Sequence, residues 1–586
     1  MKQFLLLLLF IYPLCVFAQP NGRNSIETII ITDVQVKAID SIVNAVYKAD
    51  EPGASVLLAQ NGKILLRKGY GMANMELRVP VYPDHVFAIA SMSKYFTAVA
   101  ILILQEQGKL NVKDDVHKYM PAYNTHGKTI SIENLLTHTS GIPGDGEMQS
   151  YGVKAKLEES RYTGMQFSED QPLLFEPGTN WSYSNPGFNL LAFIVEKASG
   201  QSFKEFVQQN ILNKLGMNQT YFGRKGVIPL KTTGYAFNQQ RNIYERIEEG
   251  SYVESKFLGS GSIYSTVDDL YRWHNGLKEG KIISPALLKK AWTSYTLSDG
   301  TDAHYAYGRS INIINNHSVV GHAGALPNYL SYEWQMPDDN IYFVILSNQR
   351  QSLLYPILIA DKVAALIMGI EPEPQIKIPD SAQLLKLIGV YETEATGSRL
   401  QKNYSTQKVF WDIFQEAGKL YVKRIGAVKR ELLPFNDSTW YTKTNPFGRF
   451  TFRKNAAGQT IGLKTSGLVT QHGPDRFGKK ISDDIPSQPV SIAMDSTGLV
   501  KYCGIFQQEA GTRQKLMIER NKLMLTDEDN LDKKELSYTG NHSFFDLKTD
   551  ILYNFIADKK GNIIELNYFN GTWDIVAKRI RDNYKL

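Results

Sequence analysis

The spacing of apolar residues predicts a helix followed by a β-hairpin near the start of the chain. After Asp33, apolar side chains recur every three or four residues, which places them on one face of a helix. They are Val36, Ile39, Ile42, Val43 and Val46. Two apolar runs follow at 54–60 and 63–67, and Asn61-Gly62 between them favours the positive φ angles of a tight hairpin turn.

The same pattern occurs in reverse order before residue 370. Segments 331–335 and 341–346 flank the turn sequence Pro337-Asp338-Asp339-Asn340, and the apolar segment 355–368 predicts a closing helix. We therefore expect residues 27–369 to form one α/β unit whose antiparallel sheet is assembled from both of its ends. The more helical middle of the unit then forms a second lobe.

The rest of the chain is patterned as two β modules. Residues 370–383 contain Pro372, Pro374 and Pro379 among polar residues, a composition typical of linkers. Beyond them, Gly418-Lys419-Leu420 resembles Asn521-Lys522-Leu523, and Phe450-Thr451-Phe452 resembles Tyr553-Asn554-Phe555 at the same offset. We predict two β-barrel or β-sandwich modules, at 384–484 and 490–586; the alternative is chance similarity among short strands.

The N-terminal segment has the composition of a secretory signal. Lys2 precedes an almost wholly apolar stretch at 4–17, and Val16-Phe17-Ala18 ends in a small residue. We expect cleavage after Ala18, export to the periplasm or the medium, and no stable membrane insertion afterwards. An uncleaved anchor is the alternative.

The amino-acid composition and charge limit the classes of binding partner to be expected. The chain has 65 basic and 59 acidic residues, a net charge of +6, and no run of five like charges, so nothing in it indicates a nucleic-acid partner. Its 43% hydrophobic and 21% charged residues are ordinary for a globular protein. A small-molecule or peptide substrate is expected, with cell-wall material among the candidates, and the oligomeric state is open.

The strongest local signal for chemistry is Ser91-Met92-Ser93-Lys94, which opens an apolar helix candidate. Residues three apart share a helix face, so Ser91 and Lys94 are expected side by side at the positive end of the helix dipole. A serine hydroxyl becomes a useful nucleophile when a neighbour takes its proton. The spacing alone is weak evidence, because Ser405-Thr406-Gln407-Lys408 repeats it with no helix behind it.

Two later segments carry further candidates. Tyr183 and Asn185, before the apolar segment 190–197, offer a phenol for proton transfer and an amide for orienting a substrate; the alternative is a polar turn. His322-Ala323-Gly324 ends an apolar strand candidate, and its glycine would let a substrate approach the backbone. A structural histidine is the alternative there.

Together and in this order, the motifs resemble those of the serine β-lactamase and penicillin-binding protein superfamily, in its class C-like branch. Ser91-x-x-Lys94 matches the first motif, Tyr183-x-Asn185 the second, and His322-x-Gly324 stands where the third often reads Lys-Thr-Gly. Segments 135–143 and 259–265 support the resemblance, and we assign them an architectural role.

The resemblance implies a fold class for the whole chain. It is a β-lactamase/transpeptidase-like α/β catalytic domain, with an antiparallel sheet flanked by helices plus a helical lobe, followed by two small all-β domains. The tail resembles the paired lipocalin-like barrels of some D-aminopeptidases.

The resemblance also implies covalent acyl transfer. Ser91 is then the nucleophile, Lys94 and Tyr183 share the proton transfer with the principal base left open, and Asn185 holds the substrate or Lys94. The backbone N–H groups of Ser91 and Ala325, beside Gly324, are then the oxyanion donors. No metal and no cofactor is implied, and the ten histidines show no zinc-hydrolase spacing.

His322 changes the expected substrate. A lysine there is a permanent cation suited to a carboxylate, whereas histidine is mostly neutral near pH 7. We therefore expect a serine hydrolase acting on an amide, a peptide, including D-amino-acid peptides, or an ester. The alternatives are an acyltransferase with the same acyl-enzyme, a β-lactamase or D,D-peptidase and, more distantly, a non-catalytic cell-wall-binding protein.

Overall fold

The computed structural model describes most of the chain outside its N-terminal segment. The described residues are 28–144, 172–223, 227–238, 243–247, 258–350, 355–370, 379–394, 408–424, 429–442, 445–466, 477–484, 490–508, 513–527, 530–546, 548, 551–569 and 574–582. The signal peptide predicted at 1–18 and most of the linker predicted at 370–383 lie outside them. Within these ranges no helix is long and apolar enough to cross a bilayer.

A six-stranded antiparallel sheet joins the two ends of the first unit, in the order β10-β11-β12-β13-β1-β2. Its strands are β10 (Ser310–Ile314), β11 (His317–Ala325), β12 (Leu330–Met336), β13 (Ile341–Ser347), β1 (Ala54–Gln60) and β2 (Lys63–Tyr70). Ala54 of β1 lies opposite Ser347 of β13, so the first and last strands of the unit pair inside the sheet. This confirms the predicted hairpins; β2 is longer than its apolar run.

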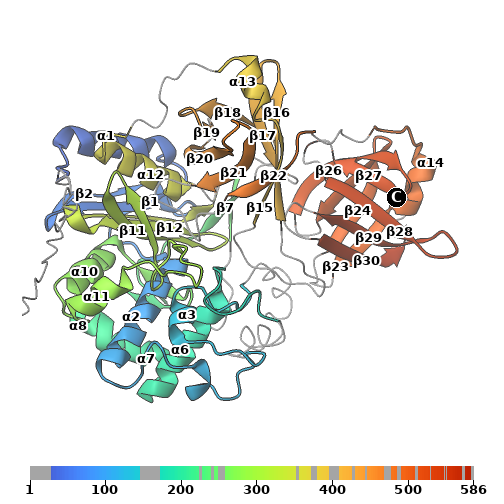
Figure 1. The fold of residues 1–586 in the computed structure, drawn as a ribbon. Helices are drawn as coiled ribbons and strands as arrows, with labels where there is room; N and C mark the ends of the chain where they lie inside the picture. Colours follow the sequence, from blue (N-terminus) through green and yellow to red (C-terminus); the bar gives the residue numbers. More distant parts are fainter. Residues whose placement is uncertain are drawn as a thin grey trace, which may run out of the picture.

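Both faces of the sheet are covered, which explains why β1 is buried throughout. Val56 and Leu58 point into the core that α1 (Asp33–Val46) and α12 (Tyr355–Ile367) share. Leu57 and Ala59 point into the other core, with the helical lobe. Figure 1 shows the sheet between α1 and α12 above it and the lobe below it.

The helical lobe is built around α2 (Ser93–Glu106), in which every residue from Ser93 to Leu104 is buried. The other helices among the described residues of the unit are α3 (Ile132–Leu136), α6 (Asn185–Ser199), α7 (Phe203–Val207), α8 (Asn213–Leu215), α10 (Val267–Lys278) and α11 (Pro285–Ala291). Single turns are η1 (Ala90–Met92), η2 (Val116–Lys118), η3 (Gln208–Leu212) and η4 (Pro337–Asp339). Helix α2 packs on α6, and α10 packs on β1 and β13.

Short strands complete the unit in three small sheets. β5 (Phe87–Ala88), β9 (Ile263–Ser265) and β6 (Tyr221–Phe222) form one, and β14 (Gln349–Arg350), β7 (Tyr235–Asn238) and β8 (Ile243–Arg246) form another. β3 (Met72–Asn74) pairs with β4 (Val79–Pro80).

The tail forms two closed eight-stranded barrels, which confirms the two predicted β modules. The first contains β15 (Gly389–Glu394), β16 (Lys408–Glu416), β17 (Lys419–Arg424), β18 (Arg430–Pro434), β19 (Thr439–Thr442), β20 (Asn445–Lys454), β21 (Thr460–Ser466) and β22 (Gly478–Ser482). The second contains β23 (Gly504–Gln508), β24 (Arg513–Glu519), β25 (Lys522–Asp527), β26 (Asn530–Gly540), β27 (Ser543–Asp546), β28 (Ile551–Ala557), β29 (Ile563–Phe569) and β30 (Asp574–Asp582). The short helices α13 (Ser381–Leu385) and α14 (Ser496–Leu499) precede them, the latter running into η5 (Val500–Tyr502).

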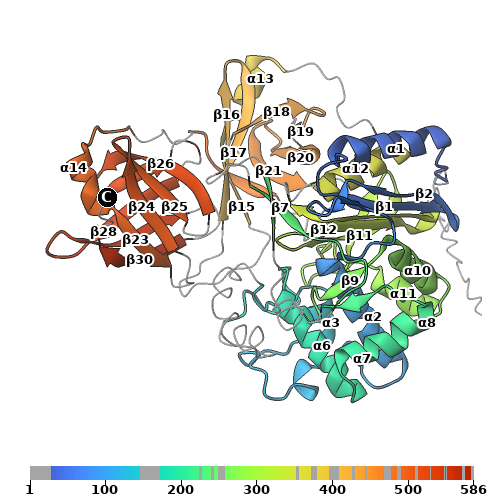
Figure 2. The same cartoon turned by 180° about the vertical axis from the view of Figure 1, so that it is seen from behind.

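The repeated sequence segments lie at equivalent places in the two barrels. Lys419-Leu420 and Lys522-Leu523 begin the third strands, β17 and β25, and 450–452 and 553–555 lie in the sixth strands, β20 and β28. The first strands correspond as well. Gly389 and Gly504 begin the first strand of each barrel at φ angles of 147° and 154°. Two residues later, Tyr391 and Phe506 point into the respective cores. The first barrel contacts α12 through β20, and both views place the second barrel farther from the six-stranded sheet (Figures 1 and 2).

The buried face of α2 generates a stability prediction. Phe96 is 1% exposed and stacks on Trp273 with ring centroids 4.3 Å apart. Phe96→Ala should lower the free energy of unfolding by about 3–5 kcal/mol, because it removes buried apolar contacts and leaves a cavity. Ile313→Ala, at a side chain that is 75% exposed, should change it by less than about 0.5 kcal/mol. Urea unfolding of both variants measures the difference, and equal losses would contradict the packing described.

Candidate active site

Ser91 lies in the single turn η1, between the short strand β5 and the first residue of α2. Ala90 before it has a φ of +48°, a conformation that costs energy for any residue with a Cβ. Ser331 Oγ donates a hydrogen bond of 2.9 Å to the carbonyl of Ile89, and the Ile263 N–H donates one of 3.1 Å to Ser93 Oγ. These contacts fix the backbone on both sides of Ser91, which is itself half-buried.

Lys94, one turn later, is fully buried and points its amino group at three oxygen atoms. Its Nζ lies 3.1 Å from Ser91 Oγ, 2.5 Å from Asn185 Oδ1 and 2.8 Å from the carbonyl oxygen of Ser260. As a neutral amine, Lys94 keeps two protons, which match the amide and carbonyl oxygens. Its lone pair is then available to the hydroxyl of Ser91.

Tyr183 and Asn185 reach Lys94 because a helix begins between them. Ser184 is the N-cap of α6, and its Oγ accepts the N–H of Gly187 at 3.1 Å. Asn185 is the first residue of that helix, and the Tyr183 ring centroid lies 4.7 Å from Lys94 Nζ. The structure thus brings together four of the residues that the sequence singled out.

His322 lies in β11, is 3% exposed, and has a ring centroid 6.1 Å from that of Tyr183. Its Nδ1 lies 2.5 Å from the carbonyl oxygen of Ala323, and its Nε2 lies 2.9 Å from Tyr305 Oη. A carbonyl oxygen only accepts, so we assign the proton to Nδ1. Burial raises the pKa of the Tyr305 phenol well above its usual value, so that hydroxyl stays protonated and can donate to Nε2. The partners of His322 therefore suit a neutral ring.

Gly324 lets β11 approach the turn that carries Ser91. A Cβ on Gly324 would lie 2.2 Å from the carbonyl oxygen of Ile89 and 2.2 Å from Ser331 Oγ, far closer than real atoms approach. Ala325 ends β11 opposite Leu330. Its role as an oxyanion donor stays a prediction.

Known proteins resemble this chain in sequence and in structure. The sequence profile of the family described as Beta-lactamase matches residues 39–365, more than half of the chain. The chain belongs to the Beta-lactamase family. It is 26% identical to Penicillin-binding protein 4* of Bacillus subtilis (strain 168) over 424 residues, which cover 70% of this chain and 91% of that protein.

Two further proteins match different lengths of this chain. Protein flp of Staphylococcus aureus (strain COL) is 30% identical over 329 residues, 54% of this chain and 64% of that protein. The solved structure of the octameric penicillin-binding protein homologue from Pyrococcus abyssi superposes with a TM-score of 0.53 at 22% identity, covering 85% of this chain and 99% of that one. The second match supports the fold alone.

Three contacts of this Beta-lactamase family site were not singled out from the sequence. His138, from segment 135–143, packs its ring 4.4 Å from that of Tyr183, and Tyr305 bonds to His322. Ser260, from segment 259–265, supplies its carbonyl to Lys94. Both segments were assigned an architectural role, and both contact the site. Tyr305 carries no local sequence signal.

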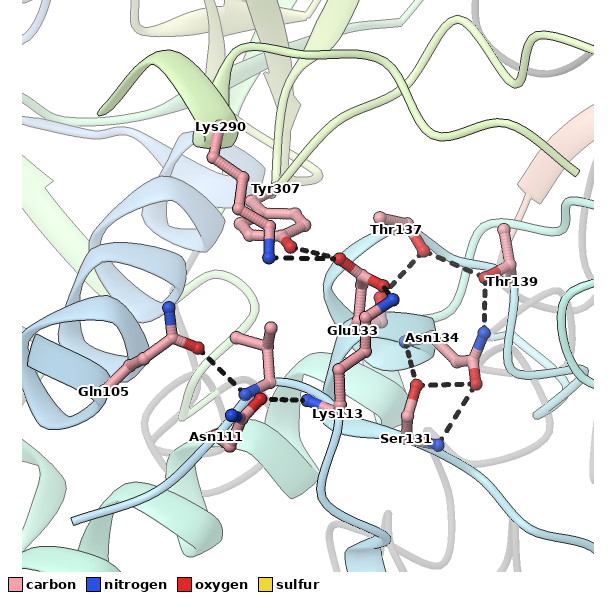
Figure 3. Close-up of polar contacts among 11 residues, drawn as sticks. Gln105, Asn111, Lys113, Ser131, Glu133, Asn134, Thr137, Thr139, Lys290 and Tyr307 are labelled. Carbon is pink, nitrogen blue, oxygen red and sulfur yellow. Dashed lines mark hydrogen bonds and ion pairs between the residues drawn. The ribbon is translucent and has the colours of Figure 1, made fainter. Parts of the chain in front are cut away.

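A polar network anchors the segment that carries His138 (Figure 3). Thr137 Oγ1 donates to the carbonyl of Glu133 at 2.8 Å and lies 2.9 Å from Thr139 Oγ1, to which Asn134 Nδ2 donates at 3.0 Å. The Glu133 carboxylate pairs with Lys113 and accepts from Tyr307.

The described residues contain no group of His, Cys, Asp or Glu side chains that could hold a metal ion.

Glu133 generates a prediction about pH. Burial raises the pKa of its carboxyl, but hydrogen bonds from Lys113 and Tyr307 outweigh burial and hold that pKa below its usual 4.5. The stabilisation is therefore fully present above pH 4.5 and is lost as the pH falls through the lowered, folded-state pKa. We expect the loss of unfolding free energy in Glu133→Gln to be largest near pH 7 and to shrink in acid.

Urea unfolding of wild type and Glu133→Gln at a series of pH values from 7 down to 3.5 measures this loss. Glu279→Gln changes a carboxylate whose side chain is 52% exposed and serves as the matched control. A loss for Glu133→Gln that stays constant across the series would contradict the predicted linkage.

Proposed function

We propose that this protein is an exported serine hydrolase that acts on an amide, a peptide or an ester through an acyl-enzyme on Ser91. The observation that carries the proposal is the contact of 3.1 Å between Ser91 Oγ and the buried Nζ of Lys94. Membership of the Beta-lactamase family supports it. The apolar stretch at 4–17 supports export.

In the proposed reaction, Ser91 Oγ attacks the carbonyl carbon of the substrate while its proton passes to Lys94 or Tyr183. The new C–O bond displaces an electron pair onto the carbonyl oxygen, which the N–H groups of Ser91 and Ala325 receive. Collapse breaks the bond to the amine or alcohol, which leaves with the proton. Water then hydrolyses the ester on Ser91 with the same group as base.

The surroundings of His322 support neutral acyl donors. Its two ring nitrogens face Tyr305 and the carbonyl of Ala323, and its partners suit a neutral ring. A site without a fixed cation at this position gains little from a substrate carboxylate. Small neutral amides, peptides and esters are therefore the favoured substrates, ahead of penicillins and D-Ala-D-Ala peptides.

Intact-mass spectrometry tests the covalent step. After brief exposure to p-nitrophenyl acetate, a D-alanyl amide, benzylpenicillin or a D-Ala-D-Ala peptide, wild type should gain the mass of the acyl group from at least one donor. Ser91→Ala should gain none, because the attacking oxygen is gone. Ser405→Ala removes the serine of the other Ser-x-x-Lys sequence and should label like wild type. Labelling that persists in Ser91→Ala would contradict the proposal.

The role of His322 is tested by changing the charge at that position. His322→Lys supplies a cation, so the rate of acylation by benzylpenicillin relative to p-nitrophenyl acetate should rise about 10-fold or more over wild type, the value of one charged hydrogen bond. His322→Gln, which is neutral, is the control and should leave that ratio near the wild-type value. The same ratio in both variants would show that charge at this position does not select the donor.

A further inference from the structure

His138 makes two backbone contacts, one on each side of Tyr183. The N–H of Ser184 donates to His138 Nδ1 at 3.1 Å, and the N–H of Ser182 donates to the His138 carbonyl oxygen at 2.9 Å. The His138 ring also packs against the Tyr183 ring, and the two ring centroids are 4.4 Å apart. One residue thus holds the backbone before and after Tyr183 and also packs against its side chain.

The contact at Ser184 also determines where Asn185 lies. Ser184 caps α6, and Asn185, the first residue of that helix, places its Oδ1 2.5 Å from Lys94 Nζ. A shift of the Ser184 N–H away from His138 would move the start of α6. Both Tyr183 and Asn185 would then change their position relative to Lys94.

His138 is itself held in an unusual conformation. It is 1% exposed and has a φ of +59°, in the left-handed region that residues with a Cβ rarely adopt. The hydroxyls of Thr137 and Thr139 on either side of it belong to the network around Glu133 (Figure 3). Strained backbone of this kind persists where the surroundings over-determine it, and such residues cluster at functional sites.

The hydrogen bond at Nδ1 determines the tautomer of the His138 ring. A backbone N–H only donates, so Nδ1 is an acceptor, and the ring is the tautomer with its proton on Nε2. His138 contacts the site through Tyr183, Ser184 and Tyr305, and Tyr305 bonds to His322. Its effect on the reaction is therefore indirect.

We propose that His138 is a positioning residue for acylation of Ser91: it clamps residues 182–184 so that Tyr183 and Asn185 face Lys94. This inference rests on the proposed function and adds to it a residue outside the three motifs.

Two substitutions separate the hydrogen bond from the packing. His138→Asn keeps an acceptor where Nδ1 lies and tolerates the left-handed backbone, whereas His138→Phe keeps a ring and loses the acceptor. Acylation by p-nitrophenyl acetate should fall about 100-fold in kcat for His138→Phe, with KM nearly unchanged, because a displacement near 1 Å has that effect. His138→Asn should recover most of this loss.

His126→Phe is the matched control. His126 is exposed and has a φ of +54°, so this variant imposes the same backbone strain away from the site and should react like wild type. Equal kcat for His138→Phe and wild type, or a larger loss in His138→Asn than in His138→Phe, would overturn the proposal.

Hydrogen exchange supplies a readout that needs no substrate. The Ser184 amide should exchange faster in His138→Phe than in wild type and stay protected in His138→Asn, since only the latter keeps the side-chain acceptor. The Ser182 amide donates to the backbone carbonyl of residue 138, which both variants keep, so it serves as the internal reference. Unchanged protection in His138→Phe would overturn the clamp even if no donor reacts. A wild-type protein that keeps this protection pattern and is acylated by no donor would count against the proposed function and not against the clamp.

Discussion

The buried amino group of Lys94 is the constraint on which the rest of the site depends. A polar group removed from water costs free energy unless hydrogen bonds replace its hydration, and Lys94 is 0% exposed. Three of its hydrogen-bonding partners come from three separate parts of the chain: the turn before α2, the start of α6 and the segment after residue 258. Satisfying this one group therefore brings these parts to one point.

The position of Lys94 in the fold explains why it is buried. Helix α2 is the central helix of the lobe, buried on all sides from Ser93 to Leu104, and Lys94 lies in its first turn. Tyr95 next to it stacks under the guanidinium of Arg309, 3.7 Å from the ring centroid, and Arg309 pairs with Glu333 of β12. This buried charge pair thus ties the start of α2 to the sheet, and the site lies where helix and sheet meet.

Beside Lys94 the site is lined by aromatic side chains. The partners of His322 suit an uncharged ring, and the rings of His138, Trp181 and His322 lie near the Tyr183 ring, as does Lys94 Nζ. Burial strengthens the electrostatic effect of Lys94 on the Ser91 hydroxyl that it contacts, because its surroundings screen less than water does. The chemistry is therefore concentrated at Ser91 and Lys94, while the aromatic residues shape the space beside them.

The sequence alone determined the local elements and the family. The spacing of apolar residues predicted the hairpins of the sheet, and the repeated segments predicted two β modules. Three motifs in a known order indicated the site residues Ser91, Lys94, Tyr183, Asn185 and His322. These features are readable because each depends on residues close together in the chain.

Only the tertiary structure showed His138 beside Tyr183, Tyr305 bonded to His322, and the Ser260 carbonyl on Lys94. Each of these contacts joins residues that are 17 to 166 positions apart, and one of them involves a backbone oxygen that every residue possesses. No local pattern encodes such a contact, because it arises only when folding brings distant segments together around a buried polar group.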